Sequence, residues 1–275
     1  GHALLVGYGG SGKQSLTQLA AYTAGYKVFS ITLKRNYKEV DFRDELKKLY
    51  EQLTQKPTVF LFTDAHVVEE GFLELINNML TVGMVPALFD EAGRGDLAQK
   101  VADEAKKLGI VQKDELWDYT LEKIRDNLHI VLAMSPAGEN LRVRCRNFPG
   151  LISNTTIDWF FPWPSDALFA VANFYLEEVE LPEEDREAIT QHIVTVHSSV
   201  YDYSRDFEIQ LKRKNFSTPK NYLDFLTSYR NMLATNRKMY GNMITRYENG
   251  LLKLEAAAKD VEEMQVQLTI SQKEL

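Results

Sequence analysis

A glycine-rich turn near the start of the chain sets the tightest limit on what this sequence can fold into. Ala3 to Val6 is a short apolar run, and the turn GYGGSGK, Gly7 to Lys13, follows it directly. A helical pattern then runs from Lys13 to Ala24. A strand, such a turn and a helix in this order, with Gly7 spaced from Gly12-Lys13 as here, are typical of a phosphate-binding loop. The sequence therefore predicts an α/β fold around a site for phosphate groups.

The residue types in this loop suit that chemistry. Small residues let several backbone N–H groups close around a phosphate, and the N-terminus of the following helix adds a partial positive charge. The ammonium group of Lys13 is expected to reach the outer phosphates of a nucleotide. The residues that we expect to bind nucleotide are Gly7, Gly9, Gly10, Ser11, Gly12, Lys13, Gln14 and Ser15.

The loop departs from the usual pattern where a magnesium ligand is expected. A Ser or Thr hydroxyl normally follows the lysine and binds Mg²⁺, but here Gln14 follows it and the hydroxyl comes at Ser15. One residue along a helix is a rotation of about 100°, so Ser15 does not point where the usual ligand points. We expect Mg²⁺ to be weakly held, through Gln14 or Ser15 together with a later carboxylate.

That carboxylate is Asp64, which follows the buried apolar run Thr58 to Phe62. Phosphoryl-transfer sites of this kind pair an acid that holds Mg²⁺ with an acid that activates water. Thr63-Asp64-Ala65 offers one acid instead of two. Either Asp64 holds the metal and the base is missing, or Asp64 is the shortened base and the metal acid is missing.

The rest of the first half alternates strands with helices, which predicts a parallel sheet with helices on both faces. Asp90 to Asn127 contains two charged helical stretches and is expected to be a surface insertion. The remaining strands are expected at Lys27–Leu33, Leu128–Met134 and Thr155–Phe161, and the remaining helices at Asp41–Gln55 and Glu70–Leu80.

Three parts are expected along the chain. Residues 1–163 form the large α/β nucleotide-binding part, and residues 164–238, which are helical in pattern only, form a small lid. Residues 239–275 form the first strand of a coiled coil, because Leu254, Val261, Leu268 and Leu275 repeat at heptad spacing. Lid helices are expected at Leu168–Glu178, Pro182–Tyr203 and Pro219–Leu233.

Composition excludes several classes of function. The net charge of −7 argues against general nucleic-acid binding, and no apolar run approaches the roughly 18 residues of a membrane span. Cys145 is the single cysteine, so no disulfide can form within the chain. Because the sequence starts at Gly1 and enters a core strand almost at once, we interpret it as a segment of a longer polypeptide.

Several motifs together resemble one family. GYGGSGKQSL (7–16), with its unusual glutamine, resembles the phosphate loop of the fourth AAA+ module in axonemal dynein heavy chains. VFLFTDAHV (59–67), LRVRCRNFPGL (141–151) and STPKNYLDFL (217–226) resemble later segments of that module, and ENGLLKLEAAAKDVEEMQVQL (248–268) resembles the start of its stalk. Cytoplasmic members have Asp-Glu where this chain has Thr63-Asp64, which favours Asp64 as the shortened base.

The resemblance also implies roles for residues outside the loop. The first sensor falls at Ser135, where Asn is usual, and the second sensor falls at Lys220 of the lid. An arginine finger that acts in trans on a neighbouring module's nucleotide is expected among Arg142, Arg144 and Arg146, with Arg146 favoured. The implied cofactors are ATP or ADP, with weakly held Mg²⁺.

The implied setting is a minus-end-directed microtubule motor of the cytoskeleton, in the cytoplasm and the axoneme of a cilium or flagellum. Its partners would be the other AAA+ modules of the same chain, a returning stalk strand, the microtubule, and dynein intermediate and light chains. In that family the fourth module binds nucleotide and regulates. Two alternatives remain: a free-standing P-loop nucleoside or small-molecule kinase, and a structural ring subunit that has lost nucleotide.

Overall fold

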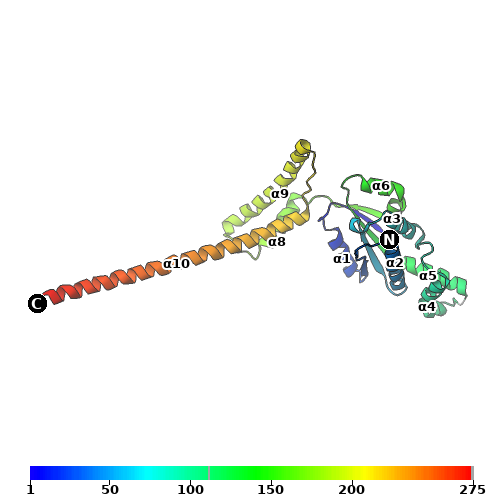
Figure 1. Ribbon diagram of the computed structural model, residues 1–275, viewed down its shortest axis with the longest axis horizontal. Helices are drawn as coiled ribbons and strands as arrows, with labels where there is room; N and C mark the ends of the chain where they lie inside the picture. Colours follow the sequence, from blue (N-terminus) through cyan, green and yellow to red (C-terminus); the bar gives the residue numbers. More distant parts are fainter. Residues whose placement is uncertain (111, 274–275) are drawn as a thin grey trace. The chain divides into compact units, whose positions relative to one another are not determined.

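The described residues form a five-stranded parallel sheet flanked by helices (Figure 1). The computed structural model describes the backbone of residues 1–110 and 112–273, and the side chains of the same residues except 267 and 269–273. The strand order is β2-β3-β4-β1-β5, and every neighbouring pair is parallel. The strands are β1 (Ala3–Val6), β2 (Lys27–Ser30), β3 (Thr58–Thr63), β4 (Leu128–Met134) and β5 (Thr156–Trp159).

The order of connections decides which helices cover which face of the sheet. The chain passes from β1 to the far edge strand β2 through α1 (Lys13–Thr23), and returns toward the centre through α2 (Glu39–Leu53) and α3 (Gly71–Val82). Crossover connections between parallel strands are right-handed. Because the chain moves across the sheet one way from β1 to β2 and the opposite way from β2 to β3 and β4, α2 and α3 lie on the face opposite α1. The expected α/β class, with helices on both faces of a parallel sheet, is confirmed.

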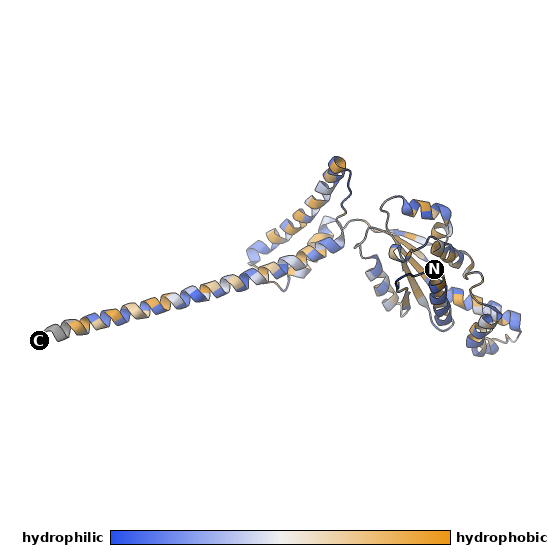
Figure 2. Ribbon diagram, viewed as in Figure 1, coloured by the Kyte–Doolittle hydropathy of each residue, from blue (hydrophilic) through white to orange (hydrophobic). Residues whose placement is uncertain are grey.

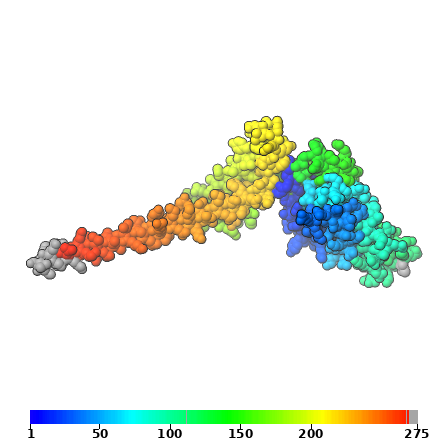
Figure 3. Space-filling view, viewed as in Figure 1, coloured from blue at the N-terminus to red at the C-terminus, as the bar shows by residue number. Residues whose placement is uncertain are grey.

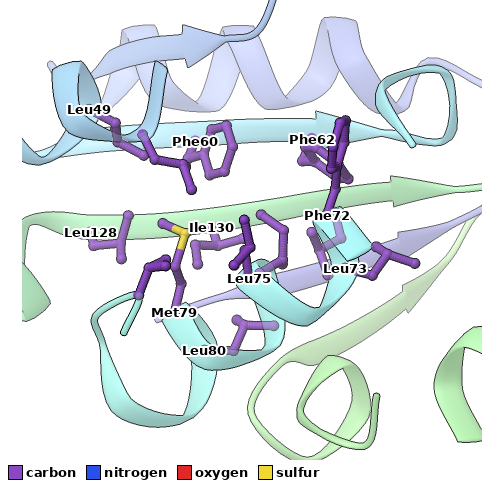
Figure 4. Packing of buried hydrophobic residues seen from close by; sticks show 14 of the residues in the cluster. Leu49, Phe60, Phe62, Phe72, Leu73, Leu75, Met79, Leu80, Leu128 and Ile130 are labelled. Carbon is purple, nitrogen blue, oxygen red and sulfur yellow. The ribbon is translucent and has the colours of Figure 1, made fainter. Parts of the chain in front are cut away.

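The main hydrophobic core lies between the sheet and the helices α2 and α3. The central strand β3 is buried along its whole length, and its Phe60 and Phe62 belong to the same core cluster as Phe72 of α3 (Figure 4). The ring of Phe62 also packs against Phe42 of α2. Figure 2 shows hydrophobic residues gathered along the central strands. α1 contributes less to burial, because Leu16, Leu19 and Tyr22 on this helix are exposed.

Phe72→Ala is expected to destabilise this core strongly. The Phe72 side chain has no exposed surface and stacks on Phe42, with a ring-centroid distance of 4.6 Å. Truncation of a fully buried phenylalanine typically costs about 3–5 kcal/mol, because it removes apolar contacts and leaves a cavity. Urea denaturation should show this loss, whereas Val82→Ala at the 55 % exposed end of the same helix should change little. A loss for Phe72→Ala below ~1 kcal/mol would contradict the packing described here.

The expected surface insertion is a pair of helices between α3 and β4. α4 (Glu91–Lys107) and α5 (Lys113–Asn127) pack against each other, and the Asp90 carboxylate caps α4 by accepting from the backbone N–H of Gly93. Two short helices, α6 (Asn140–Asn147) and α7 (Gly150–Ser153), then lie between β4 and β5. The sequence patterns had not predicted α6 or α7.

The chain divides into two compact units. One contains residues 1–164 and 201–221, and the other contains residues 165–200 and 222–275. The expected division at 163 and 238 stays a prediction. Tyr222, fully buried in the second unit, donates a hydrogen bond to the Leu168 carbonyl of α8 (Ser165–Leu176). Its ring also packs against His197 of α9 (Glu183–Leu211).

The last helix, α10, runs without a break from Pro219 to Lys273, a length of 55 residues. Two separate helical stretches had been expected here, but Gly241 and Gly250 both lie inside the continuous helix. Its apolar residues Leu254, Val261 and Leu268 are exposed to solvent. Figure 3 shows the C-terminal part of the helix, in orange and red, with no other element packed around it. Their pairing with another strand stays a prediction, and Leu275 lies outside the described residues.

Other bounds differ modestly from expectation. β2 ends at Ser30 instead of Leu33, because this edge strand pairs only with β3 and its last partner is Leu61.

Within residues 1–110 and 112–273, no helix combines the length and the hydropathy needed to cross a bilayer.

Candidate nucleotide-binding site

The glycine-rich loop connects β1 to α1 and requires glycine at two positions. Gly10 and Gly12 have φ angles of +82° and +91°, a backbone region that other residues rarely adopt. A Cβ atom on Gly10 would also lie 2.9 Å from Thr218 Oγ1 and from the Cβ of Lys220. Gly12 caps the N-terminus of α1 and has open space around it. Glycine at these two positions therefore allows the tight turn of the loop and leaves open space at the N-terminus of α1.

The ammonium group of Lys13 lies inside this loop. Its Nζ donates to the backbone carbonyls of Gly7 at 2.5 Å and Tyr8 at 2.8 Å, and to Ser11 Oγ at 3.2 Å. Burial lowers the pKa of Lys13 from its ordinary value, and the negative charge of Asp64 partly offsets this effect. The lysine is thus at the centre of the loop, where a phosphate would compete with these oxygens for the ammonium group.

The first turn of α10 and the residues just before it contact the loop within the same compact unit. The backbone N–H of Lys220 donates to the Gly10 carbonyl at 3.1 Å, and the rings of Tyr8 and Phe216 stack at a centroid distance of 4.1 Å. The structure therefore brings the expected second-sensor position, Lys220, to the phosphate loop through its backbone. A role for its side chain stays a prediction.

Asp64 stands where β3 ends and a short 3-10 helix, η1 (Asp64–His66), begins. One of its oxygens, Oδ2, accepts from the backbone N–H of Ser135 at 2.5 Å. The other, Oδ1, accepts from Nη1 of Arg144 at 2.9 Å. Both oxygens of the single acid expected in this site are therefore engaged by donors of the protein. The Ser135 hydroxyl, expected to act as first sensor, accepts from the backbone N–H of Ala137 at 3.3 Å.

The three candidate finger arginines lie on the short helix α6, where residues two apart point to nearly opposite sides. Arg144 faces inward, with a side chain only 12 % exposed, and it bridges Asp64 and Glu70. Arg142 points outward and pairs with Glu139 at 3.6 Å. Arg146 is exposed and makes no ion pair or side-chain hydrogen bond within the described part of the chain.

The magnesium ligands are less well assembled than the phosphate cradle. Gln14 and Ser15 are both exposed on the first turn of α1. Among the described residues, no cluster of three or more His, Cys, Asp or Glu side chains is arranged to hold a metal ion. With both Asp64 oxygens engaged, the residues present fit a nucleotide's phosphates better than a tightly bound Mg²⁺ ion. The predicted Mg²⁺ contacts of Gln14, Ser15 and Asp64 stay predictions.

Two features of the site had escaped the sequence interpretation. Glu70, just before α3, is a second carboxylate on the guanidinium that binds Asp64, with contacts of 3.0 and 3.1 Å. Asp64 and Arg144 are 80 positions apart, so no local pattern reveals their pairing. The partners of the Tyr8–Phe216 stack are even further apart in sequence, although an aromatic residue inside a glycine-rich loop is itself unusual.

A parallel α/β sheet, a glycine-rich loop before a helix, a buried lysine inside that loop and an acid after β3 together define a P-loop nucleotide-binding domain. The comparison with known families is more specific. Residues 1–232 match the family described as "P-loop containing dynein motor region D4". The chain belongs to this family, so it is an AAA+ module of a dynein heavy chain motor region.

Relatives match over nearly the whole chain. It is 55 % identical over 275 residues, 99 % of its length, to the dynein-1-alpha heavy chain of the flagellar inner arm I1 complex of Chlamydomonas reinhardtii. It is 50 % identical over 272 residues, 98 % of its length, to human dynein axonemal heavy chain 10. The chain spans only 6 % of the length of each of these relatives. The resemblance to axonemal dynein heavy chains is confirmed.

Proposed function

We propose that this chain is a regulatory module of an axonemal dynein heavy chain that binds ATP, hydrolyses it slowly or not at all, and anchors the stalk. The observation that carries the proposal is a contrast within the site. The phosphate-binding parts are complete, whereas the single acid that could assist hydrolysis has both oxygens engaged by Ser135 and Arg144.

Nucleotide binding is supported by three groups that act together. The loop offers backbone N–H groups, the N-terminus of α1 adds partial positive charge, and Lys13 supplies a full charge. These groups bind and orient the phosphates without any acid. ATP and ADP would both be accommodated on these contacts, since the loop addresses phosphate and not base.

Slow hydrolysis is supported by the residues at the positions where catalytic groups are expected around the phosphates. Positioning and charge stabilisation supply nearly all of phosphoryl-transfer catalysis. Gln14 replaces the usual magnesium hydroxyl, Thr63-Asp64 supplies one carboxylate instead of two, and Ser135 replaces the usual Asn. A general base that is missing or misplaced forfeits ~10²–10⁴-fold in rate. Magnesium, when bound, would neutralise phosphate charge here.

A nucleotide bound without rapid turnover would act as a clamp. It would hold the loop, α1 and the 216–220 segment in one arrangement, close to the start of α10. We infer that α10 continues as the outgoing stalk strand, paired with a returning strand, and that the microtubule is reached through the stalk tip. The neighbouring modules, dynein intermediate and light chains and an axonemal location follow from the same proposal.

Single-turnover hydrolysis tests the proposed slow rate. We expect radiolabelled ATP to bind at this site and to be hydrolysed well below ~1 s⁻¹, the low end for ordinary phosphoryl-transfer enzymes. The measurement requires the heavy-chain motor domain with the phosphate loops of the other modules disabled. Asp64→Asn serves as the comparison, because it removes the only acid at this position. A rate near ~1 s⁻¹ that Asp64→Asn abolishes would show an active ATPase site instead.

A free-standing kinase is the less well supported alternative. Such an enzyme needs an acceptor pocket beside the phosphates. The structure has a cleft of roughly 720 Å³, but it lies between α4 and α5 and is lined by residues such as Phe89, Arg94 and Trp117. None of the residues lining this cleft belongs to the phosphate loop or to β3.

A further inference from the structure

Arg144 belongs to the candidate site through its contact with Asp64, and not only to a surface that could face a neighbour. It lies on α6, which α7 separates from β5, and its guanidinium reaches back to the end of β3. Fully exposed ion pairs contribute little, but here the Arg144 side chain is only 12 % exposed, with Asp64 at 37 % and Glu70 at 61 %.

The guanidinium is held from two sides. Its Nη1 donates to Asp64 Oδ1 at 2.9 Å, while its Nε and Nη2 donate to Glu70 Oε1 at 3.1 and 3.0 Å. Because the donors of a guanidinium are fixed in one plane, the Glu70 contact fixes the direction from which Arg144 approaches Asp64. Glu70 thus anchors the arginine, and the arginine restrains the aspartate.

Asp64 is restrained at its other oxygen as well. The backbone N–H of Ser135 donates to Oδ2 at 2.5 Å, so the carboxylate bridges the end of β4 and helix α6. A general base must present an oxygen to the attacking water within hydrogen-bond reach. Each oxygen keeps a second lone pair, but its direction is fixed by these two donors, so Asp64 can turn toward a water placed elsewhere only by breaking the Ser135 or the Arg144 hydrogen bond.

We propose that Arg144 is a positioning residue that restrains Asp64 and thereby keeps hydrolysis at this site slow. The inference rests on the proposed function, because it explains how a site that binds ATP avoids turning it over. It assigns Arg144 to its own module's site, whereas a finger would act on the neighbour's nucleotide. Faster hydrolysis would need no additional catalytic group. Without the Arg144 guanidinium, Asp64 keeps only the hydrogen bond from Ser135 and can turn to accept a proton from water.

The test is a gain in rate, which damage to the fold does not produce. In the heavy-chain motor domain with the other phosphate loops disabled, Arg144→Ala should hydrolyse labelled ATP about tenfold to hundredfold faster in a single turnover, since a working general base contributes ~10²–10⁴-fold. The Kd for ATP should stay within about twofold, because the phosphate contacts of the loop and Lys13 are untouched. Arg144→Lys should gain less, because a single ammonium keeps part of the contact.

Two further variants test whether the gain in rate depends on Asp64 and whether it is specific to Arg144. Adding Asp64→Asn to Arg144→Ala should return the rate to the slow value, since the gain depends on the released carboxylate. Arg43→Ala, which removes an Arg43–Glu39 ion pair of 2.7 Å on α2, is the matched control and should leave rate and Kd unchanged.

The outcomes distinguish this inference from the proposed function. ATP binding with an unchanged or slower rate in both Arg144→Ala and Arg144→Lys would overturn the restraint alone. A gain that survives the addition of Asp64→Asn would also overturn it, because another group would then be responsible. If the unmodified module binds no ATP, the proposed function fails together with the inference.

Discussion

Lys13→Ala is expected to abolish ATP binding at this module. Lys13 is the cation inside the phosphate loop, and its Nζ lies within 3.2 Å of three loop oxygens. A hydrogen bond to a charged group contributes about 1.5–3 kcal/mol, so loss of two such bonds to the outer phosphates should weaken the Kd by ~10²–10⁴-fold. Equilibrium titration with labelled ATP, with the other modules' loops disabled, measures the change.

The lysine also holds the carbonyls of Gly7 and Tyr8, so its removal could loosen the loop as well as remove a charge. Thermal unfolding of the variant checks this second effect. Lys27→Ala, which removes an exposed lysine from the edge strand β2, is the control and should leave ATP affinity unchanged. An unchanged affinity for Lys13→Ala would show that this loop does not bind the phosphates.

Arg146→Ala is expected to slow ATP hydrolysis at the neighbouring module by up to ~10³-fold, if Arg146 acts as a full arginine finger. Arg144 is committed to Asp64 and Glu70, Arg142 makes only an exposed pair with Glu139 at 3.6 Å, and Arg146, exposed near the end of α6, makes no ion pair among the described residues. A finger needs a guanidinium that is free to reach a phosphate of another module. ATP affinity at this module's own site should stay unchanged.

The measurement is steady-state and single-turnover hydrolysis at the neighbouring site in the intact motor domain. Arg142→Ala and Arg144→Ala are compared in parallel, since all three arginines share one short helix. We expect the largest loss in the neighbour's turnover for Arg146→Ala. If all three alanine variants leave that turnover intact, no finger lies on α6.

The central strands β3 and β4 were predictable from the sequence because they are largely buried. Val59-Phe60-Leu61-Phe62 and the run from Leu128 to Met134 are apolar almost without interruption, and both are strands. The phosphate loop was also predictable, because its tight turn requires positive φ angles that favour glycine, and Gly10 and Gly12 have such angles. Burial and backbone conformation leave strong local signals in sequence.

The missed elements left no such signal. In LRVRCRN the arginines alternate with other residues, a period of two that conceals the helix α6. The lid helix ending at Leu233 and the heptad pattern of the tail were expected as separate stretches, yet α10 joins them, and Gly241 and Gly250, at a cost of about 1 kcal/mol each, do not break it. The Arg144–Asp64 pair depends on how strands and helices are brought together, which a single sequence does not record.

The unbroken helix α10 has a mechanical consequence. Its 55 residues, at a rise of about 1.5 Å each, extend ~80 Å from a first turn whose Lys220 amide is bonded to the phosphate loop. Over such a length, tilting the axis by ~1° at its base displaces the far end by ~1.4 Å. A straight helix of this kind is a lever arm, in which a change of a few degrees in axis direction at one end becomes a displacement of several ångströms at the other.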